Sequence, residues 1–195
     1  MPIRETLRVN YGDSFTTVVR SDWRIALLSS GGKLLTYEFD NLVEYCRQNN
    51  FKLLAEFYLY PFEGSEEVVE ISIDVKSKST SEIEQLVLEH AFIKNAVLTT
   101  SDHQIVFVTT HDEMGIMLGT ASAIREITGH DVESLNHSFE EYTKEWRASP
   151  KLAADGLLKL AAMYPTAFDE GMIVEVDFKS GSVFPENNEP YDTIV

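Results

Sequence analysis

Residues 98–129, LTTSDHQIVFVTTHDEMGIMLGTASAIREITG, carry the clearest structural pattern in the chain. The four apolar residues at 105–108 form a short run that is typical of a buried strand. Ser101 and Asp102 precede this run, and their side chains favour a tight turn after a strand that ends near Thr100. We therefore expect two strands joined by a turn at the centre of the fold.

The same stretch predicts a helix behind the second strand. Asp112 is of a type that caps helix N-termini, and Gly129 is suited to end a helix. Between them apolar residues recur at spacings of three and four: Met114, Met117, Leu118, Ala121, Ile124 and Ile127. These features predict a helix over residues 112–129.

The remaining elements follow from the same two periodicities. Strands are expected at 3–9, 15–19, 24–28, 33–39, 51–60, 68–75 and 172–178. Helices are expected at 40–49, 81–94, 131–148 and 150–164. Strands 51–60 and 68–75 should pair antiparallel, because a loop with Pro61 and Gly64 joins them.

Local signals refine three of these helices. Asp40 is the expected cap of the first helix, where Cys46 shares an apolar face with Leu42 and Val43. Ser81 and Glu84 have the spacing of a capping box. On 131–148 the expected buried face is formed by four residues: Leu135, Phe139, Tyr142 and Trp146.

These elements predict an α+β fold, with a mainly antiparallel sheet packed by about four to five helices. We expect a single domain over residues 1–179 and a loosely held polar tail over 180–195. Residues 18–25 also resemble residues 98–105, with Ser and Asp in the same places. This echo raises the hypothesis of two related β-β-α units, although common hairpin sequences explain it more simply.

Net charge is the unusual property of the composition. The chain has 16 Lys and Arg against 32 Asp and Glu, a net charge of −16. Residues 1–60 are balanced, with seven basic and seven acidic side chains, so the entire excess belongs to 61–195. Such a charge repels nucleic acid and anionic lipid and favours encounter with a basic partner, although solubility alone also explains it.

Sequence motifs for catalysis or cofactor binding are missing. Cys46 is the sole cysteine, which excludes an internal disulfide, and its place on an apolar helix face predicts an unreactive thiol. His103 and His111 flank a strand and would lie about 26 Å apart in an extended chain, so we predict no metal site there. We also predict no cofactor, and an enzyme is the less favoured class.

The favoured hypothesis is a non-enzymatic acidic binding protein. It would be an inhibitor, antitoxin or immunity protein that occludes a basic partner, such as a nuclease toxin, by charge complementarity. The expected contact residues lie in two acidic stretches: Glu63, Glu66, Glu67, Glu70, Glu133, Glu140, Glu141 and Glu145.

Two alternatives stay open. One is a small enzyme or ligand-binding protein with a site around His103, His111 and Glu113. The other is an assembly protein that associates through an exposed strand edge. The first residues lack a basic start followed by an apolar run, and no apolar stretch of about 18 residues occurs, so a cytoplasmic location is expected.

Overall fold

The fold was analysed in a computed structural model of the whole chain. The structure describes residues 7–10, 14–28, 37–58, 68–91, 95–109 and 114–185. Within these ranges ten strands and five helices form an α+β fold, as the sequence predicts. Every strand pairing is antiparallel.

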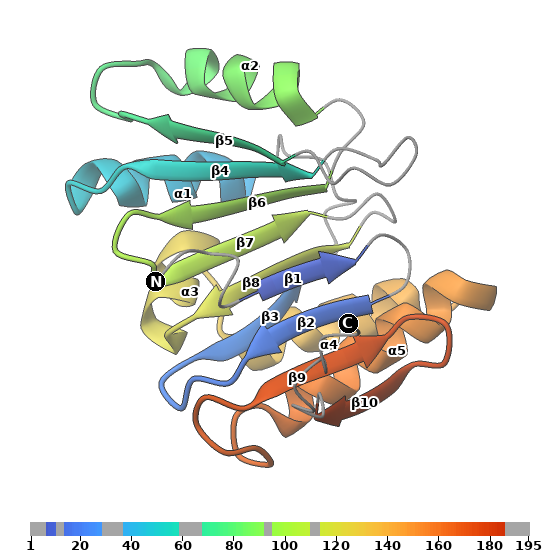
Figure 1. Ribbon diagram of the computed structural model, residues 1–195. Coiled ribbons are helices and arrows are strands. Elements are labelled where there is room, and N and C mark those ends of the chain that lie inside the picture. Colours follow the sequence, from blue (N-terminus) through green and yellow to red (C-terminus); the bar gives the residue numbers. More distant parts are fainter. Residues whose placement is uncertain are drawn as a thin grey trace, which may run out of the picture.

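The strands form two sheets (Figure 1). The smaller sheet has the order β1-β2-β9-β10, with bounds Leu7–Asn10, Ser14–Val18, Ile173–Asp177 and Ser182–Pro185. The larger sheet has the order β3-β8-β7-β6-β4-β5. Its strands are β3 Arg24–Leu28, β4 Leu53–Tyr58, β5 Val68–Ile73, β6 Asn95–Thr100, β7 Ile105–Thr109 and β8 Gly115–Gly119. The expected pairing of β4 with β5 is confirmed.

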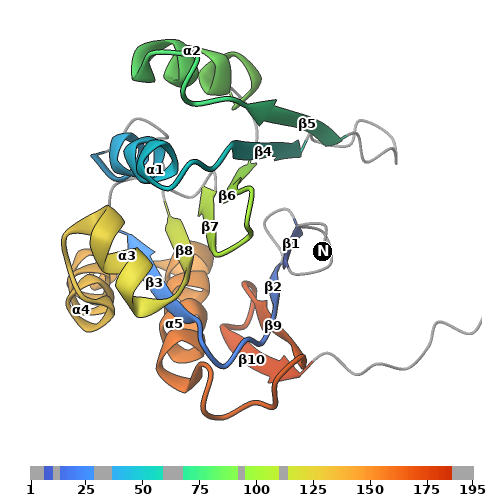
Figure 2. The same ribbon diagram turned by 90° about the vertical axis from the view of Figure 1, so that its left-hand side faces the viewer.

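Five helices cover the larger sheet and its junction with the smaller one. They are α1 Tyr37–Gln48, α2 Thr80–Ala91, α3 Ala121–Thr128, α4 Val132–Thr143 and α5 Ala148–Met163. Figure 2 shows α1 and α3 on one side of the larger sheet and strands β1 and β2 on the other. No helix of the described part of the chain is long and apolar enough to cross a membrane.

Two buried clusters lie on opposite faces of the larger sheet. On one face Leu98 and Phe107 pack with apolar residues of α1 and α3, including Cys46, which the sequence correctly places in the core. On the other face Val106 and Leu118 pack with residues of the smaller sheet and α5. Because both faces are covered, the central strands have apolar residues on both faces.

The central segment differs from its prediction at the expected helix over 112–129. Residues 115–119 form strand β8 instead, and α3 begins only at Ala121, with Thr120 as its N-cap. Asp112 lies outside the described residues. The run Gly115–Gly119 is buried on both faces, so its apolar spacing fits a strand as well as a helix. The end at Gly129 is confirmed, in the left-handed conformation.

Two other helix starts also differ. Helix α1 begins at Tyr37, so residues 37–39 of the expected strand 33–39 are helical, and residues 33–36 lie outside the described ranges. The capping box of α2 is Ser79 with Glu82, two residues before the predicted pair. Arg47 of α1 donates a 2.8 Å hydrogen bond to the Thr80 hydroxyl, and this tertiary contact helps to fix where α2 starts.

The predicted tail over 180–195 begins with an ordered hairpin. Strand β10 pairs with β9, and residues 186–195 lie outside the described part. The hairpin packs closely on α5: a Cβ added at Gly156 of α5 would lie only 2.6 Å from Val176 Cγ1 of β9. Only glycine allows this approach.

Candidate binding surface

Three of the eight predicted contact residues, Glu133, Glu140 and Glu141, lie on α4. A fourth, Glu145, lies in the turn that follows the helix. The N-cap of α4 is Asp131, the first residue of the expected helix 131–148, and the carboxylate accepts a 2.7 Å hydrogen bond from the backbone N–H of Ser134. This bond lowers the pKa of Asp131. A negative charge at a helix N-terminus is also favoured by the helix dipole.

The rotation of α4 about its axis is set by Asn136. Its amide oxygen accepts a 2.8 Å hydrogen bond from the N–H of Leu27, and its amide nitrogen donates to the carbonyl of Ile25 at 3.0 Å. One side chain thereby satisfies two backbone groups on the outer edge of β3, which would otherwise be open to another strand. Asn136 must therefore face the sheet.

This rotation changes which residues of α4 are buried. Val132, Phe139 and Thr143 face the protein, whereas Tyr142 is 42% exposed. The predicted buried face is therefore correct at Phe139 and wrong at Tyr142. The spacing of apolar residues does not predict the contact of Asn136 with β3, and this contact sets which side of α4 faces the sheet.

Tyr142 and Trp146 form an aromatic pair in which Tyr142 is exposed and Trp146 is partly buried against the core. Their ring centroids lie 5.5 Å apart in an edge-on arrangement, and Trp146 also contacts Phe139 at 6.5 Å. Phe139 is completely buried, so it anchors the pair to the core. Tyrosine and tryptophan held in this way are the residues that dominate many protein interfaces.

Acidic side chains flank the aromatic pair. Glu133, Glu140, Glu141 and Glu145 are all exposed. Glu133 and Glu140 are seven residues apart and so share one face of α4. Lys144 pairs with Glu141 at 3.2 Å, but both side chains are more than half exposed, and such a pair contributes little to stability.

The other predicted acids are separated from this surface. Glu70 is exposed on β5, at the opposite edge of the larger sheet from β3 and α4. Five strand spacings place these two edges about 24 Å apart. Glu63, Glu66 and Glu67 lie outside the described residues. The structure therefore does not bring Glu70 together with the acids of α4.

Negative charge is not confined to α4. Exposed carboxylates also occur on the other helices, for example Asp40, Glu89, Glu126 and Asp155. What distinguishes α4 and the turn behind it is the combination of carboxylates with an aromatic pair whose outer member, Tyr142, is exposed.

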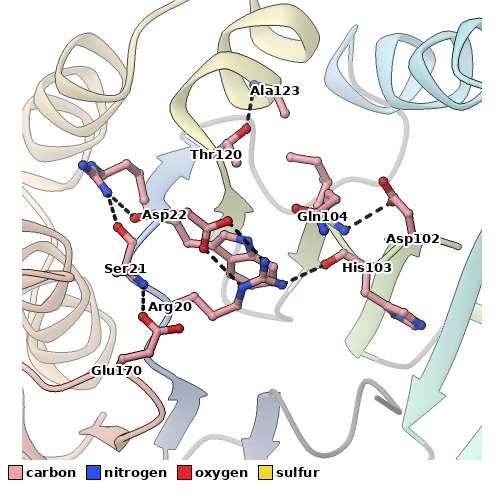
Figure 3. Close-up of polar contacts among 12 residues, drawn as sticks. Arg20, Ser21, Asp22, Asp102, His103, Gln104, Thr120, Ala123 and Glu170 are labelled. Carbon is pink, nitrogen blue, oxygen red and sulfur yellow. Dashed lines mark hydrogen bonds and ion pairs between the residues drawn. The ribbon is translucent and has the colours of Figure 1, made fainter.

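Two turns meet at a different place, beside α3 (Figure 3). In one, the N–H of Trp23 donates to the carbonyl of Arg20 at 3.1 Å, and in the other the N–H of His103 donates to the carbonyl of Thr100 at 2.8 Å. The Arg20 guanidinium lies 4.3 Å from the centre of the Trp23 ring and donates to the carbonyl of His103 at 3.4 Å. Asp22 forms an ion pair with Arg20 at 3.2 Å.

Residues 164–172 hold the first turn from the other side. The Tyr164 hydroxyl accepts a 2.8 Å hydrogen bond from the N–H of Arg20, and Glu170 accepts one from the N–H of Ser21. Burial is the main cause that raises the pKa of Tyr164 to about 12. Both hydrogen bonds are made to backbone N–H groups, so they hold the main chain of the first turn in place.

His103 also lines a cavity on the larger sheet. The cavity has a volume of about 360 Å³, and its lining includes Leu54, Glu56, Glu70, Ser72 and His103. Glu56 is the one charged side chain among the described residues that is buried. His111 and Glu113, the other members of the predicted histidine site, lie outside the described residues.

Metal-binding and nucleophilic chemistry find no further support in the described part. There, no three His, Cys, Asp or Glu side chains lie close enough together to hold a metal ion. Burial is also the main cause that raises the pKa of the Cys46 thiol to about 12. The nucleophilic thiolate is therefore strongly disfavoured.

Sequence reasoning missed three residues that shape these sites. Glu56 follows apolar residues in a strand pattern, and its charge was the available signal that a polar feature lies within the sheet. Tyr142 was assigned to the core. Asn136 gave no signal, because an amide on a helix is ordinarily a surface residue.

No protein-family model matches the chain, and searches of curated proteins and of solved structures find no significant match.

Proposed function

We propose that the chain is a non-enzymatic acidic binding protein that occludes a basic partner protein. The supporting observation is the exposed Tyr142 at the end of α4, which packs edge-on against the partly buried Trp146 and lies among Glu140, Glu141 and Glu145. Aromatic anchors supply most of the binding energy at such interfaces, while surrounding charges increase the association rate and select the partner. We name this set the α4 surface.

The class of partner follows from charge. A net charge of −16 repels nucleic acid, so the complementary ligand is a protein with a basic surface. A nuclease has such a surface where it binds phosphates. An inhibitor or immunity protein for a nuclease toxin, acting in the cytoplasm, is therefore the specific form of the proposal.

The experiment is affinity capture from a cytoplasmic extract with the whole chain immobilised. A basic protein should be retained at low salt and released at about 0.5 M salt, because screening weakens attraction between exposed charges. If the retained protein is a nuclease, adding the free chain should inhibit its activity in proportion to occupancy.

Matched variants test the surface itself. Glu140→Gln combined with Glu141→Gln should lower the association rate, and Tyr142→Ala should raise the dissociation rate. Glu84→Gln combined with Glu89→Gln on α2 removes equal charge elsewhere and should leave both rates within about twofold. Equal binding by the α4 variants and the α2 control contradicts the proposal, as does failure to retain any basic protein.

A further inference from the structure

The turn between α4 and α5 contributes directly to the α4 surface. Residues 144–147 join the two helices. Among them are Trp146, whose ring lies edge-on to Tyr142, and Glu145, one of the acids of the surface. The shape of this turn therefore decides where Trp146 and Glu145 lie relative to the exposed tyrosine.

Backbone hydrogen bonds hold the beginning of the turn. The N–H of Lys144 donates to the carbonyl of Glu141 at 3.4 Å, and the N–H of Trp146 donates to the carbonyl of Thr143 at 3.0 Å. Both acceptors belong to the last turn of α4. These bonds fix how the segment leaves the helix.

A single side chain holds the end of the turn. Arg147 Nη1 donates to the carbonyl of Glu145 at 2.9 Å and to the carbonyl of Trp146 at 2.8 Å. The two carbonyls belong to the two residues that the turn contributes to the α4 surface. One guanidinium nitrogen thereby fixes the main chain at both of them.

The place of Arg147 in the chain is not explained by helix capping. Arg147 is the N-cap of α5, and its side chain makes no capping hydrogen bond. Arginine has no acceptor atom and so cannot cap a helix N-terminus, where Ser, Thr, Asp or Asn is preferred. Its side chain turns back to the two carbonyls instead.

The residue after Arg147 shows that the shape of the turn needs such support. Ala148 has a φ of 56°, in the left-handed region that favours glycine. Local backbone preference therefore opposes this conformation, and contacts on either side have to maintain it. The hydrogen bonds of Arg147 are the contacts immediately before Ala148.

We propose that Arg147 is a positioning residue of the α4 surface, which holds Trp146 against Tyr142 and so fixes the tyrosine ring before a partner binds. This inference rests on the proposed function. A side chain that is already held loses less conformational freedom on binding, and this advantage appears as slower dissociation. The positive charge of Arg147 has the opposite effect, because it repels a basic partner and slows association.

The test compares Arg147→Gln with Lys144→Gln, since each removes one positive charge from the same turn. The Lys144 ammonium pairs with the carboxylate of Glu141 and not with a carbonyl of the turn. With the partner retained in the capture experiment, both variants should associate faster than the wild type. Only Arg147→Gln should also dissociate faster, by about threefold to tenfold, the range expected when one more side chain has to be ordered on binding.

A second measurement needs no partner. In NMR spectra of the whole chain, nuclear Overhauser contacts between the rings of Tyr142 and Trp146 should be present in the wild type and in Lys144→Gln, because the ring centroids are 5.5 Å apart. They should be weaker in Arg147→Gln. Arg147 is exposed, so the thermal unfolding midpoint of its variant should stay close to that of the wild type.

Two results would overturn the positioning role: equal dissociation rates for Arg147→Gln and Lys144→Gln, or undiminished contacts between the two rings in Arg147→Gln. Failure to capture a basic partner contradicts the proposed function, and the ring contacts then still test Arg147. A captured partner that leaves Arg147→Gln as slowly as it leaves the wild type supports the proposed function and contradicts the positioning role.

Discussion

The turns at Ser21–Asp22 and Ser101–Asp102 are alike in sequence and in local geometry, yet they lead to different structures. Each closes with a backbone hydrogen bond from the residue after Asp to the residue before Ser. The second turn joins β6 to β7 in a hairpin, whereas the first carries the chain from β2 in the smaller sheet to β3 in the larger sheet. The echo at an offset of 80 residues therefore predicts two turns and not two equivalent units.

The difference comes from what the flanking residues contact. Val19 accepts a hydrogen bond from Gly171 and donates one to Met172, which continues the pairing of β2 with β9. Trp23 is 1% exposed in the core between the sheets, whereas His103 is half-buried at the rim of the cavity. A turn sequence thus specifies a local reversal, and competing long-range partners decide where the next strand goes.

The largest expected difference in stability is between substitutions of Trp23 and of His103, the residues that follow Asp22 and Asp102. Trp23→Ala should destabilise the fold by about 3–5 kcal/mol, because it leaves a large cavity in the core. His103→Ala should change stability by about 0.5 kcal/mol. Urea unfolding followed by circular dichroism measures both.

If Trp23→Ala prevents folding altogether, Trp23→Phe keeps most of the apolar contact and should cost less. Equal costs at positions 23 and 103 would mean that the two turns are equivalent after all.

The next effect concerns Tyr164, whose hydroxyl accepts a hydrogen bond from the N–H of Arg20 at the first turn. Its pKa in the folded state is raised to about 12, against about 10 in the unfolded chain. The neutral phenol therefore stabilises the fold fully below pH 10, and this contribution is lost as the pH rises from 10 to 12. The loss amounts to about 2–3 kcal/mol.

Tyr164→Phe should have a flatter stability profile over that pH window, although it is less stable at neutral pH by about 1 kcal/mol because the N–H of Arg20 loses its acceptor. Unfolding curves at pH 8, 10 and 11 give the comparison. Parallel profiles for the wild type and the variant would show that another group causes the loss.

The smallest effect is a gain in stability at the second turn. His103 has a φ of 57°, in the left-handed region that favours glycine. His103→Gly should therefore stabilise the hairpin by up to about 1 kcal/mol, net of the greater freedom of glycine in the unfolded chain. Thermal unfolding of His103→Gly beside His103→Ala separates backbone strain from loss of the imidazole.

The candidate sites were less predictable than the fold. The exposed acids of α4 are where a surface helix would place them, but Glu70 lies at the other edge of the larger sheet. The sequence order of two acidic stretches carries no information on their distance in space. Glu56 and Glu70 line one cavity because they lie opposite each other on β4 and β5, a register that only strand pairing sets.

Apolar periodicity in the sequence alone determined the fold class, and local chemistry determined the two Ser-Asp turns and the end of α3 at Gly129. Each of these depends on residues within a few positions of one another, whose hydrogen bonds form in any context. Tertiary structure decided that residues 115–119 are a strand, that β2 and β3 separate, and that Tyr142 faces solvent. These outcomes depend on contacts between residues far apart in the chain, such as Asn136 with the edge of β3, and local pattern does not encode such contacts.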